Sequence, residues 1–361
     1  MRASASAAPK RRRVLAIIAG VAACASCAAG DSGGPPAPFD IHLPPPTVLV
    51  SLESELIGHP SDIDVDASGR VWVADSRNHR LLVVDPAGGE PLLIGREGEG
   101  PGEFRSPVRL AVTDTVVHVI DGDNLRVQQY RLDGTHVADH LIGDGMIGGG
   151  SLSREGDVVA PTLGTGSALA RVYTLADSTR RNIGAPLVTP GPWDFTAMKA
   201  EIAQGRVPDQ FRNTVAPFFG TEGTIWLLVQ TEAEVRRYGA DGQLVWSRVL
   251  EVPEIEEARR EFFRRNAEDD RPWFITPLTT MTAAREVGDK LWMLMHGEEG
   301  TRLAVFYILD RETGDIVGRV SVDVPDAVRR FAVDTVRSKL YLAVPEEATL
   351  LAVDGAGVLN R

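Results

Sequence analysis

Two short runs of polar residues carry side chains that could bind a ligand. The run DSRNHR spans residues 75–80, and the run DGDN spans residues 121–124. Carboxylates suit cations, whereas guanidinium and amide groups suit polar or anionic ligands. DGDN begins like a calcium loop but lacks the distal glutamate of that motif. The candidate ligand-binding residues in or beside these runs are Asp75, Arg77, His79, Arg105, Asp121, Asp123 and Asn124.

The same residue types have a structural alternative. Asp, Asn and Arg side chains often hold turns together through hydrogen bonds to the backbone. For Asp75, Asn78 and Arg80 the sequence favours this structural role over ligand binding.

Motifs for catalysis are absent from the sequence. It contains no G-x-x-x-x-G-K-[ST], no G-x-S-x-G and no H-E-x-x-H. No cysteine follows Cys27, so the body has neither a catalytic thiol nor a cysteine-ligated metal. The seven histidines show no spacing typical of a metal-binding ring. We therefore nominate no catalytic or metal-ligating residue and no cofactor, although binding of Ca²⁺ or Zn²⁺ stays open.

The charge balance argues against nucleic acid as a partner. The 361 residues include 38 Lys and Arg against 50 Asp and Glu, a formal net charge of −12. Binding to duplex DNA or RNA requires a cluster of basic residues that neutralises phosphates. The densest basic run of the body, at 259–265, is interspersed with glutamates and is typical of a solvated helix face.

The N-terminus is typical of an exported protein. A basic segment at 10–13 precedes a short apolar run at 14–23, the pattern of a secretory signal peptide. The following VAAC at 21–24 resembles a bacterial lipobox, and this resemblance implies that Cys24 becomes the acylated N-terminus. Cys27 is a weaker acceptor, and ordinary cleavage that releases a free protein is the alternative. We predict a signal peptide at 1–23, a flexible lipid-anchored tether at 24–46 and a folded body at 47–361.

The body consists of repeated units rich in β-strand patterns. The unit at 60–88 contains the apolar runs 71–74 and 81–84, separated by residues that form turns. Similar second-strand runs begin at 71, 117, 158, 225, 291 and 340. Three of the five intervals are about 40–50 residues, the length of one four-stranded blade. Six units fit the length of the chain.

One unit carries a specific family resemblance. The pattern P-x-x-I-x-V-D-x-x-G-x-V-W-V-A-D-S-x-N-H-R-L resembles the NHL repeat, and the glycine-rich segment 95–107 is similar to the segment between NHL blades. The resemblance implies an all-β protein, a six-bladed β-propeller, with short helical insertions between blades. In such propellers the connections between blades and the loops between second and third strands share one face. Asp62 and Arg109, near the starts of inner strands, then complete the candidate ligand-binding set.

The two ends of the body are expected to meet in the last blade. The last unit lacks an outer strand, and we expect residues 47–52 to supply it and close the ring.

The segments 192–204 and 253–266 have apolar residues at helical spacing and should form helices that cap the face with the candidate loops. Such helices could gate a ligand or simply cover the blades.

The leading functional hypothesis is a binding module of the cell envelope. It would present one propeller face to a protein, peptide or glycan, with the lipid anchor as its contact with the membrane. The alternative is a metal-dependent lyase or lactonase with its site in the central channel, as in enzymes that this architecture resembles. Histidines and carboxylates at the channel mouth would favour the enzyme, whereas arginine, aromatic and small residues would favour the binder.

Overall fold

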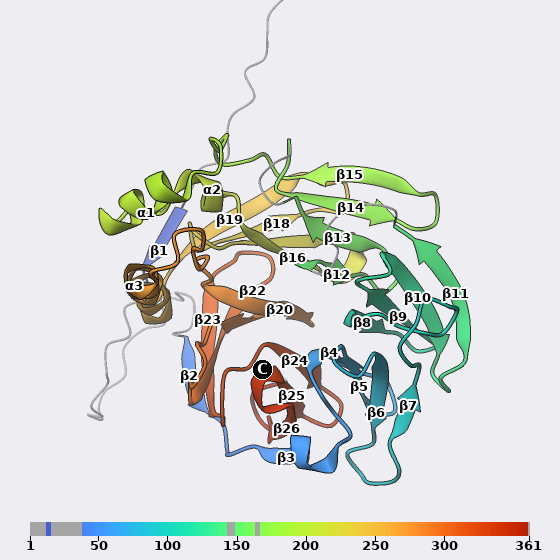
Figure 1. Cartoon of the computed structure of the whole chain (residues 1–361). Coiled ribbons are helices and arrows are strands. Elements are labelled where there is room, and N and C mark those ends of the chain that lie inside the picture. The colour runs from blue at the N-terminus through green and yellow to red at the C-terminus, as the bar shows by residue number, and fades with distance from the viewer. Residues whose placement is uncertain (1–11, 16–37, 143–148, 163–166, 360–361) are drawn as a thin grey trace, which may run out of the picture.

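The protein folds as a ring of β-sheets (Figure 1). The computed structural model describes residues 12–15, 38–142, 149–162 and 167–359. These residues form six sheets, each containing four antiparallel strands that follow one another from the centre of the ring outward. The predicted all-β, six-bladed propeller is therefore confirmed.

The blades are built from consecutive segments of the chain. Blades 1 and 2 comprise β4 (Pro60–Val65), β5 (Val71–Asp75), β6 (Arg80–Val84) and β7 (Leu92–Ile94), then β8 (Pro107–Val112), β9 (Val116–Asp121), β10 (Arg126–Arg131) and β11 (His136–Leu141). Blades 3 and 4 comprise β12 (Ser151–Leu152), β13 (Val158–Pro161), β14 (Ala170–Thr174) and β15 (Thr179–Ile183), then β16 (Val215–Phe219), β17 (Ile225–Val229), β18 (Glu234–Tyr238) and β19 (Leu244–Glu251). Blades 5 and 6 comprise β20 (Met281–Val287), β21 (Lys290–Met295), β22 (Leu303–Asp310) and β23 (Ile316–Asp323), then β24 (Arg330–Asp334), β25 (Lys339–Val344), β26 (Thr349–Asp354) and β3 (Thr47–Val50).

The second strands are the most apolar because each lies between two neighbouring blades. Every residue of β5 and of β17 is buried, and Trp72 and Trp226 are fully enclosed. Burial on both faces explains why these runs lack the alternation of a half-exposed strand. All six predicted second strands are present, from β5 to β25.

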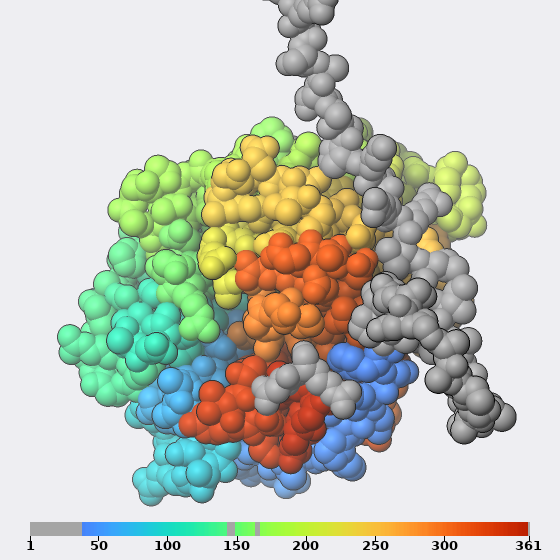
Figure 2. Space-filling view, turned by 180° about the vertical axis from the view of Figure 1, so that it is seen from behind, coloured from blue at the N-terminus to red at the C-terminus, as the bar shows by residue number. Residues whose placement is uncertain are grey.

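The ring closes by pairing the two ends of the body. Strand β3 is antiparallel to β26, with Val50 opposite Leu350 and Val48 opposite Leu351. The N-terminal and C-terminal segments therefore lie side by side in blade 6, as the view from behind shows (Figure 2). The prediction that residues 47–52 supply the missing strand is confirmed for Thr47–Val50, while Leu52–Ser54 forms a short 3₁₀ helix.

Two extra strands extend the outer edges of blades 4 and 5. Strand β1 (Arg12–Leu15), within the predicted signal peptide, is parallel to β19. Strand β2 (Phe39–His42) is parallel to β23, and the Phe39 ring covers Gly318, where a Cβ would collide with it. The ordered body thus begins before residue 47, because the last residues of the predicted tether have apolar side chains that pack against blade 5.

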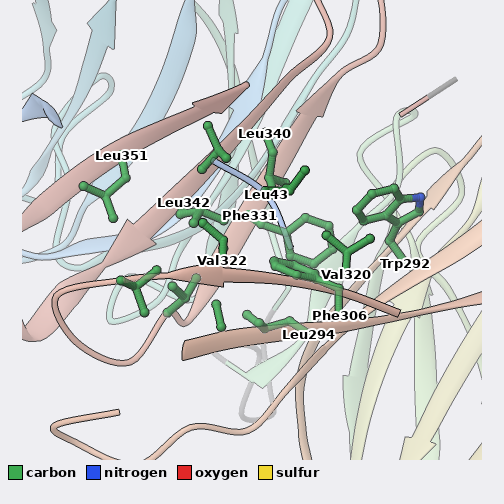
Figure 3. Close-up of a cluster of buried hydrophobic side chains, with 14 of the residues drawn as sticks. Leu43, Trp292, Leu294, Phe306, Val320, Val322, Phe331, Leu340, Leu342 and Leu351 are labelled. Carbon is green, nitrogen blue, oxygen red and sulfur yellow. The ribbon is translucent and has the colours of Figure 1, made fainter. Parts of the chain in front are cut away.

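A continuous apolar cluster joins blades 5 and 6 beneath this segment. Leu43, which follows β2, is buried in the cluster with Phe306, Phe331 and Leu342 (Figure 3). The segment before β3 is therefore held by the core as well as by strand pairing.

Three α-helices lie together beside blades 4 and 5 (Figure 1), within the described residues. They are α1 (Phe195–Ala203), α2 (Asp209–Arg212) and α3 (Pro253–Glu268). The Asp194 carboxylate caps α1 by accepting the Ala197 N–H, and Pro253 begins α3. α1 and α3 confirm the predicted insertions. None of the described helices combines the length and the apolar composition that crossing a bilayer requires.

The helices pack on one another and form a cap. Their shared apolar cluster consists of Met198, Ile202, Phe211, Phe262, Ile275 and Leu278. All three helices lie in connections between blades, so they share a face with the second-to-third-strand loops. We call this the loop face, and the opposite face, with segments such as 66–70 and 335–338, the turn face.

Candidate binding site in the central channel

The central channel contains a cavity to which the inner part of every blade contributes. Its volume is about 160 Å³. The charged residues that line it are Asp62, Asp64, Arg109, Arg154, Arg285, Glu286 and Arg330. Two of these, Asp62 and Arg109, are predicted site residues, and the ring brings them together in one cavity.

Two aspartates of β4 fix the relation between blades 1 and 2. Asp62 Oδ2 accepts the Leu110 N–H at 3.1 Å, and Asp64 Oδ2 accepts the Val112 N–H at 3.0 Å. Inner strands of neighbouring blades do not pair as a sheet, so these carboxylates satisfy backbone donors of β8. The two aspartates therefore support the ring as well as carrying negative charge.

All three guanidinium nitrogens of Arg285 donate to acceptors of the protein. Its Nη1 donates to Asp64 Oδ1 at 2.9 Å, its Nε donates to the Phe331 carbonyl at 2.6 Å, and its Nη2 donates to the Ile63 carbonyl. This side chain ties β20 to blades 1 and 6 and holds the channel wall in place.

Arg109 and Arg330 retain unused donors. Arg109 donates to the carbonyls of Gly150 and Val108 at 3.0 and 2.6 Å, and Arg330 donates to those of Thr282 and Arg329 at 3.2 and 2.7 Å. No described residue accepts a hydrogen bond from Nη2 of Arg109 or from Nη2 of Arg330. The backbone contacts thus hold both guanidinium groups at the cavity and leave the Nη2 donors of both without an acceptor in the described part of the chain.

Burial disfavours the charged forms of these two arginines. Burial, together with the nearby positive charge of Arg109, lowers the pKa of Arg330 to about 9, although Asp62 opposes the shift. Burial also lowers the pKa of Arg109. Asp62 Oδ1 is 3.9 Å from Arg330 Nε and from Arg285 Nη2, too far for a hydrogen bond. The carboxylates therefore only partly compensate the positive charge.

The other two charged residues that line the cavity, Glu286 and Arg154, interact outside it or are exposed. Glu286 accepts hydrogen bonds from Thr221 and from the Trp226 indole, and it pairs with Arg311 at 2.8 Å. Arg154 is exposed in the connection between β12 and β13, on the turn face. Three arginines and two aspartates therefore define the interior of the channel, with an excess of one positive charge.

The loop of blade 1 is held by Asp75. Its buried carboxylate accepts the backbone N–H groups of Gly58 and His59 at 3.1 and 2.9 Å and the Asn78 amide at 2.7 Å. Arg80 Nη2 donates to the Leu56 carbonyl at 2.9 Å. These contacts are the structural role that the sequence favours for Asp75, Asn78 and Arg80.

Blade 2 repeats this arrangement with Asp121. Its buried carboxylate accepts the Arg105 N–H and the Asn124 amide, both at 2.7 Å, and the Arg126 Nε at 3.0 Å. Because Arg126 neutralises Asp121, the DGDN run does not fit a calcium ion. Asn124 also donates to the Gly98 carbonyl and so holds the connection from blade 1.

The other predicted residues lie on the loop face outside the channel cavity. Arg77 and Asp123 are exposed, and the exposed Arg105 pairs with Glu99 at 2.5 Å. His79 Nδ1 accepts the Ser106 N–H at 3.1 Å and thereby joins the loop of blade 1 to the connection before blade 2. Of the seven predicted loop residues, Arg77, Arg105 and Asp123 are exposed around blades 1 and 2, whereas Asp75 and Asp121 are buried beneath them.

Among the described residues, no three His, Cys, Asp or Glu side chains lie close enough together to bind a metal ion. The channel instead presents guanidinium groups, which repel cations. The described residues do not fit the metal that the lyase or lactonase hypothesis requires.

Sequence reasoning missed Asp64, Arg285 and Arg330. Arg330 is the first residue of β24, the kind of position that singled out Asp62 and Arg109, so aligning all first strands would have found it. Arg285 lies late in β20, within MTAAREV, which has no recognisable blade pattern.

Comparison with known proteins agrees with this architecture. The sequence matches the NHL repeat over residues 58–84. A predicted exported protein from Bacteroides fragilis has a similar structure, with 12% identity, a TM-score of 0.52 and coverage of 87% of this chain and 98% of its own. Virginiamycin B lyase from Staphylococcus aureus has 12% identity and a TM-score of 0.47, with 82% and 94% covered. No curated protein matches significantly.

These observations define the class of the protein. It is a six-bladed β-propeller, and residues 58–84 of its first blade match the NHL repeat. The likeness to solved structures concerns the fold alone, so function rests on the residues of the channel and the loop face.

Proposed function

We propose that the protein is an exported, lipid-anchored binding module of the cell envelope that presents its loop face to a protein, peptide or glycan. The channel is the observation that carries this proposal. Three arginines face two aspartates in a cavity of about 160 Å³, and two guanidinium groups have donors that no described residue uses. This chemistry suits recognition of a polar or anionic group.

The helical cap adds a second feature suited to contact with a partner. Trp193 and Trp273 are 56% and 63% exposed on the cap. The Arg271 guanidinium lies 4.0 Å from the centre of the Phe274 ring. Exposed tryptophan and arginine side chains are enriched among the residues that dominate binding energy at protein interfaces.

The test compares partner capture by variants of the two faces. Wild-type protein, Trp273→Ala and Arg330→Gln would each be crosslinked in an envelope extract, with Val336→Ala as the control. Val336 is 83% exposed on the turn face. We expect one partner to be lost with the loop-face variants and retained with Val336→Ala. Equal capture by all four proteins, or loss only with Val336→Ala, would contradict the proposal.

A second measurement addresses the enzyme hypothesis. Unfolding temperature would be compared with and without EDTA, and after addition of Ca²⁺ or Zn²⁺. A bound ion at a hundredfold excess over its dissociation constant would stabilise the fold by about 2.7 kcal/mol. We expect no such shift, and a large one would favour the metal-dependent lyase or lactonase.

A further inference from the structure

We infer that the channel binds a single carboxylate group, which Arg109 and Arg330 hold through their unused guanidinium nitrogens. The inference deepens the proposed function, and rests on it, by giving the chemical class of the ligand. Arg285 acts as a positioning residue because all three of its nitrogens already donate to protein acceptors.

The hydrogen-bonding state of the arginines is the first argument. Backbone carbonyls occupy Nε and Nη1 of Arg109 and Nη1 of Arg330. Their Nη2 atoms have no acceptor among the described residues, and the side chains line the cavity. Guanidinium donors match carboxylate oxygens in geometry, so an anion there would complete both hydrogen-bonding sets.

The charge of the channel is the second argument. With three arginines and two aspartates inside, the cavity has one uncompensated positive charge. A carboxylate supplies one negative charge and balances it, whereas a dianion such as sulfate would leave a buried negative charge. Burial and the neighbouring Arg109 also lower the pKa of Arg330, in the direction that this excess of positive charge requires.

The size of the cavity is the third argument. About 160 Å³ is roughly the space of five water molecules in the liquid. It accommodates a small organic acid or the carboxylate end of a longer chain, but not a drug-sized ligand. A longer chain would have its remainder on the loop face, among the exposed side chains of the cap and of blades 1 and 2.

The test uses calorimetry on purified full-length protein at pH 7, with acetate and its neutral analogue acetamide. We expect acetate to bind and acetamide to bind at least tenfold more weakly. Sulfate, which is a dianion at pH 7, should bind more weakly than acetate at the same concentration. Equal binding of acetate and acetamide, or sulfate binding tenfold tighter than acetate, would overturn the inference.

Variants then locate the site. Arg109→Gln and Arg330→Gln should each weaken acetate binding at least tenfold, and Arg330→Lys should restore part of the loss because it keeps the charge without the planar fork. The control is Arg131→Gln, since Arg131 is exposed at the end of β10 and outside the cavity. Unchanged affinity in both glutamine variants would overturn the assignment. The wild-type comparison stands even if a variant fails to fold.

Binding of peptides distinguishes a small organic acid from the carboxylate end of a longer chain. A tripeptide with a free C-terminus that binds tenfold tighter than acetate, and loses this binding when amidated, would identify a chain end as the ligand. Equal affinity for tripeptide and acetate would identify a small acid. If no carboxylate binds while the loop-face variants still lose their envelope partner, this inference fails and the proposed function survives.

Discussion

The carboxylate of Asp62 lies 3.9 Å from the guanidinium Nε of Arg330, across the junction between the first and last blades. Residues 268 positions apart thus share one electrostatic site. Because closure of the ring creates this proximity, the charge state of the channel and the stability of the ring are linked.

Substitution of Asp62 should therefore affect both stability and anion binding. Asp62→Asn keeps an oxygen that can accept one backbone N–H but removes the charge that faces Arg285 and Arg330. We expect a loss of about 1–3 kcal/mol in the free energy of unfolding, measured in urea at pH 7. Asp114→Asn is the control, since Asp114 is exposed in a turn.

Acetate provides the second readout for Asp62→Asn. An added anion can take the place of the missing carboxylate, so acetate should stabilise Asp62→Asn more than the wild type. A loss of stability equal to that of Asp114→Asn, or no difference in the response to acetate, would show that Asp62 does not balance the channel arginines.

Two valines of β3 allow the contribution of ring closure to stability to be tested with a matched control. Val50 is 5% exposed and lies opposite Leu350, whereas Val48, two residues earlier, is 62% exposed. Val50→Asp places an unpaired charge in the core and should reduce the free energy of unfolding by about 3 kcal/mol or more. Val48→Asp should change it by less than about 0.5 kcal/mol. Similar losses in chemical denaturation would mean that β3 contributes little to closure.

The blades were predictable because their strongest signals are local. Apolar runs such as Val71–Ala74 follow a turn in which Gly69 has a φ of +91°, a conformation that favours glycine. The segment Phe39–His42 was assigned to the tether instead. It pairs with β23, almost three hundred residues away, and no local sequence pattern indicates that contact.

The channel was harder to predict than the blades. Inner strands are short or mixed in composition, as Ser151–Leu152 and Met281–Val287 illustrate. Asp62 and Arg109 were recognised from their place at the start of a blade. Arg285 acquires its role only when the ring brings it to Asp64, and that meeting depends on the packing of separate blades rather than on sequence spacing.

The buried His118 should make stability depend on pH. Burial is the main cause that lowers the pKa of its ring, and the nearby His140 adds to the shift. Below about pH 6.5 the unfolded chain gains a proton that the folded protein does not take up, so stability should fall as the pH decreases. One such group contributes a slope of at most about 1.4 kcal/mol per pH unit.

The variant His118→Gln should flatten this dependence between pH 6.5 and 5, as measured by urea unfolding at each pH. His59→Gln is the control because His59 is exposed. His118 Nε2 lies 3.3 Å from Gln129 Nε2, so a glutamine at position 118 can retain a polar contact. An unchanged slope in His118→Gln would assign the pH dependence to other groups.

The predicted anchor has a defined relation to the folded body. Cys24 lies outside the described residues, and Phe39, near the start of the described segment 38–142, packs on blade 5. About fifteen residues separate the two positions, so the connection spans at most about 50 Å when extended. Cys24→Ser should abolish labelling with a radioactive fatty acid and release the protein into the soluble fraction. Cys27→Ser should retain both the label and the membrane association. Loss of label only in Cys27→Ser would move the acylation site to Cys27, and an unlabelled wild type would refute the lipoprotein proposal without affecting the channel.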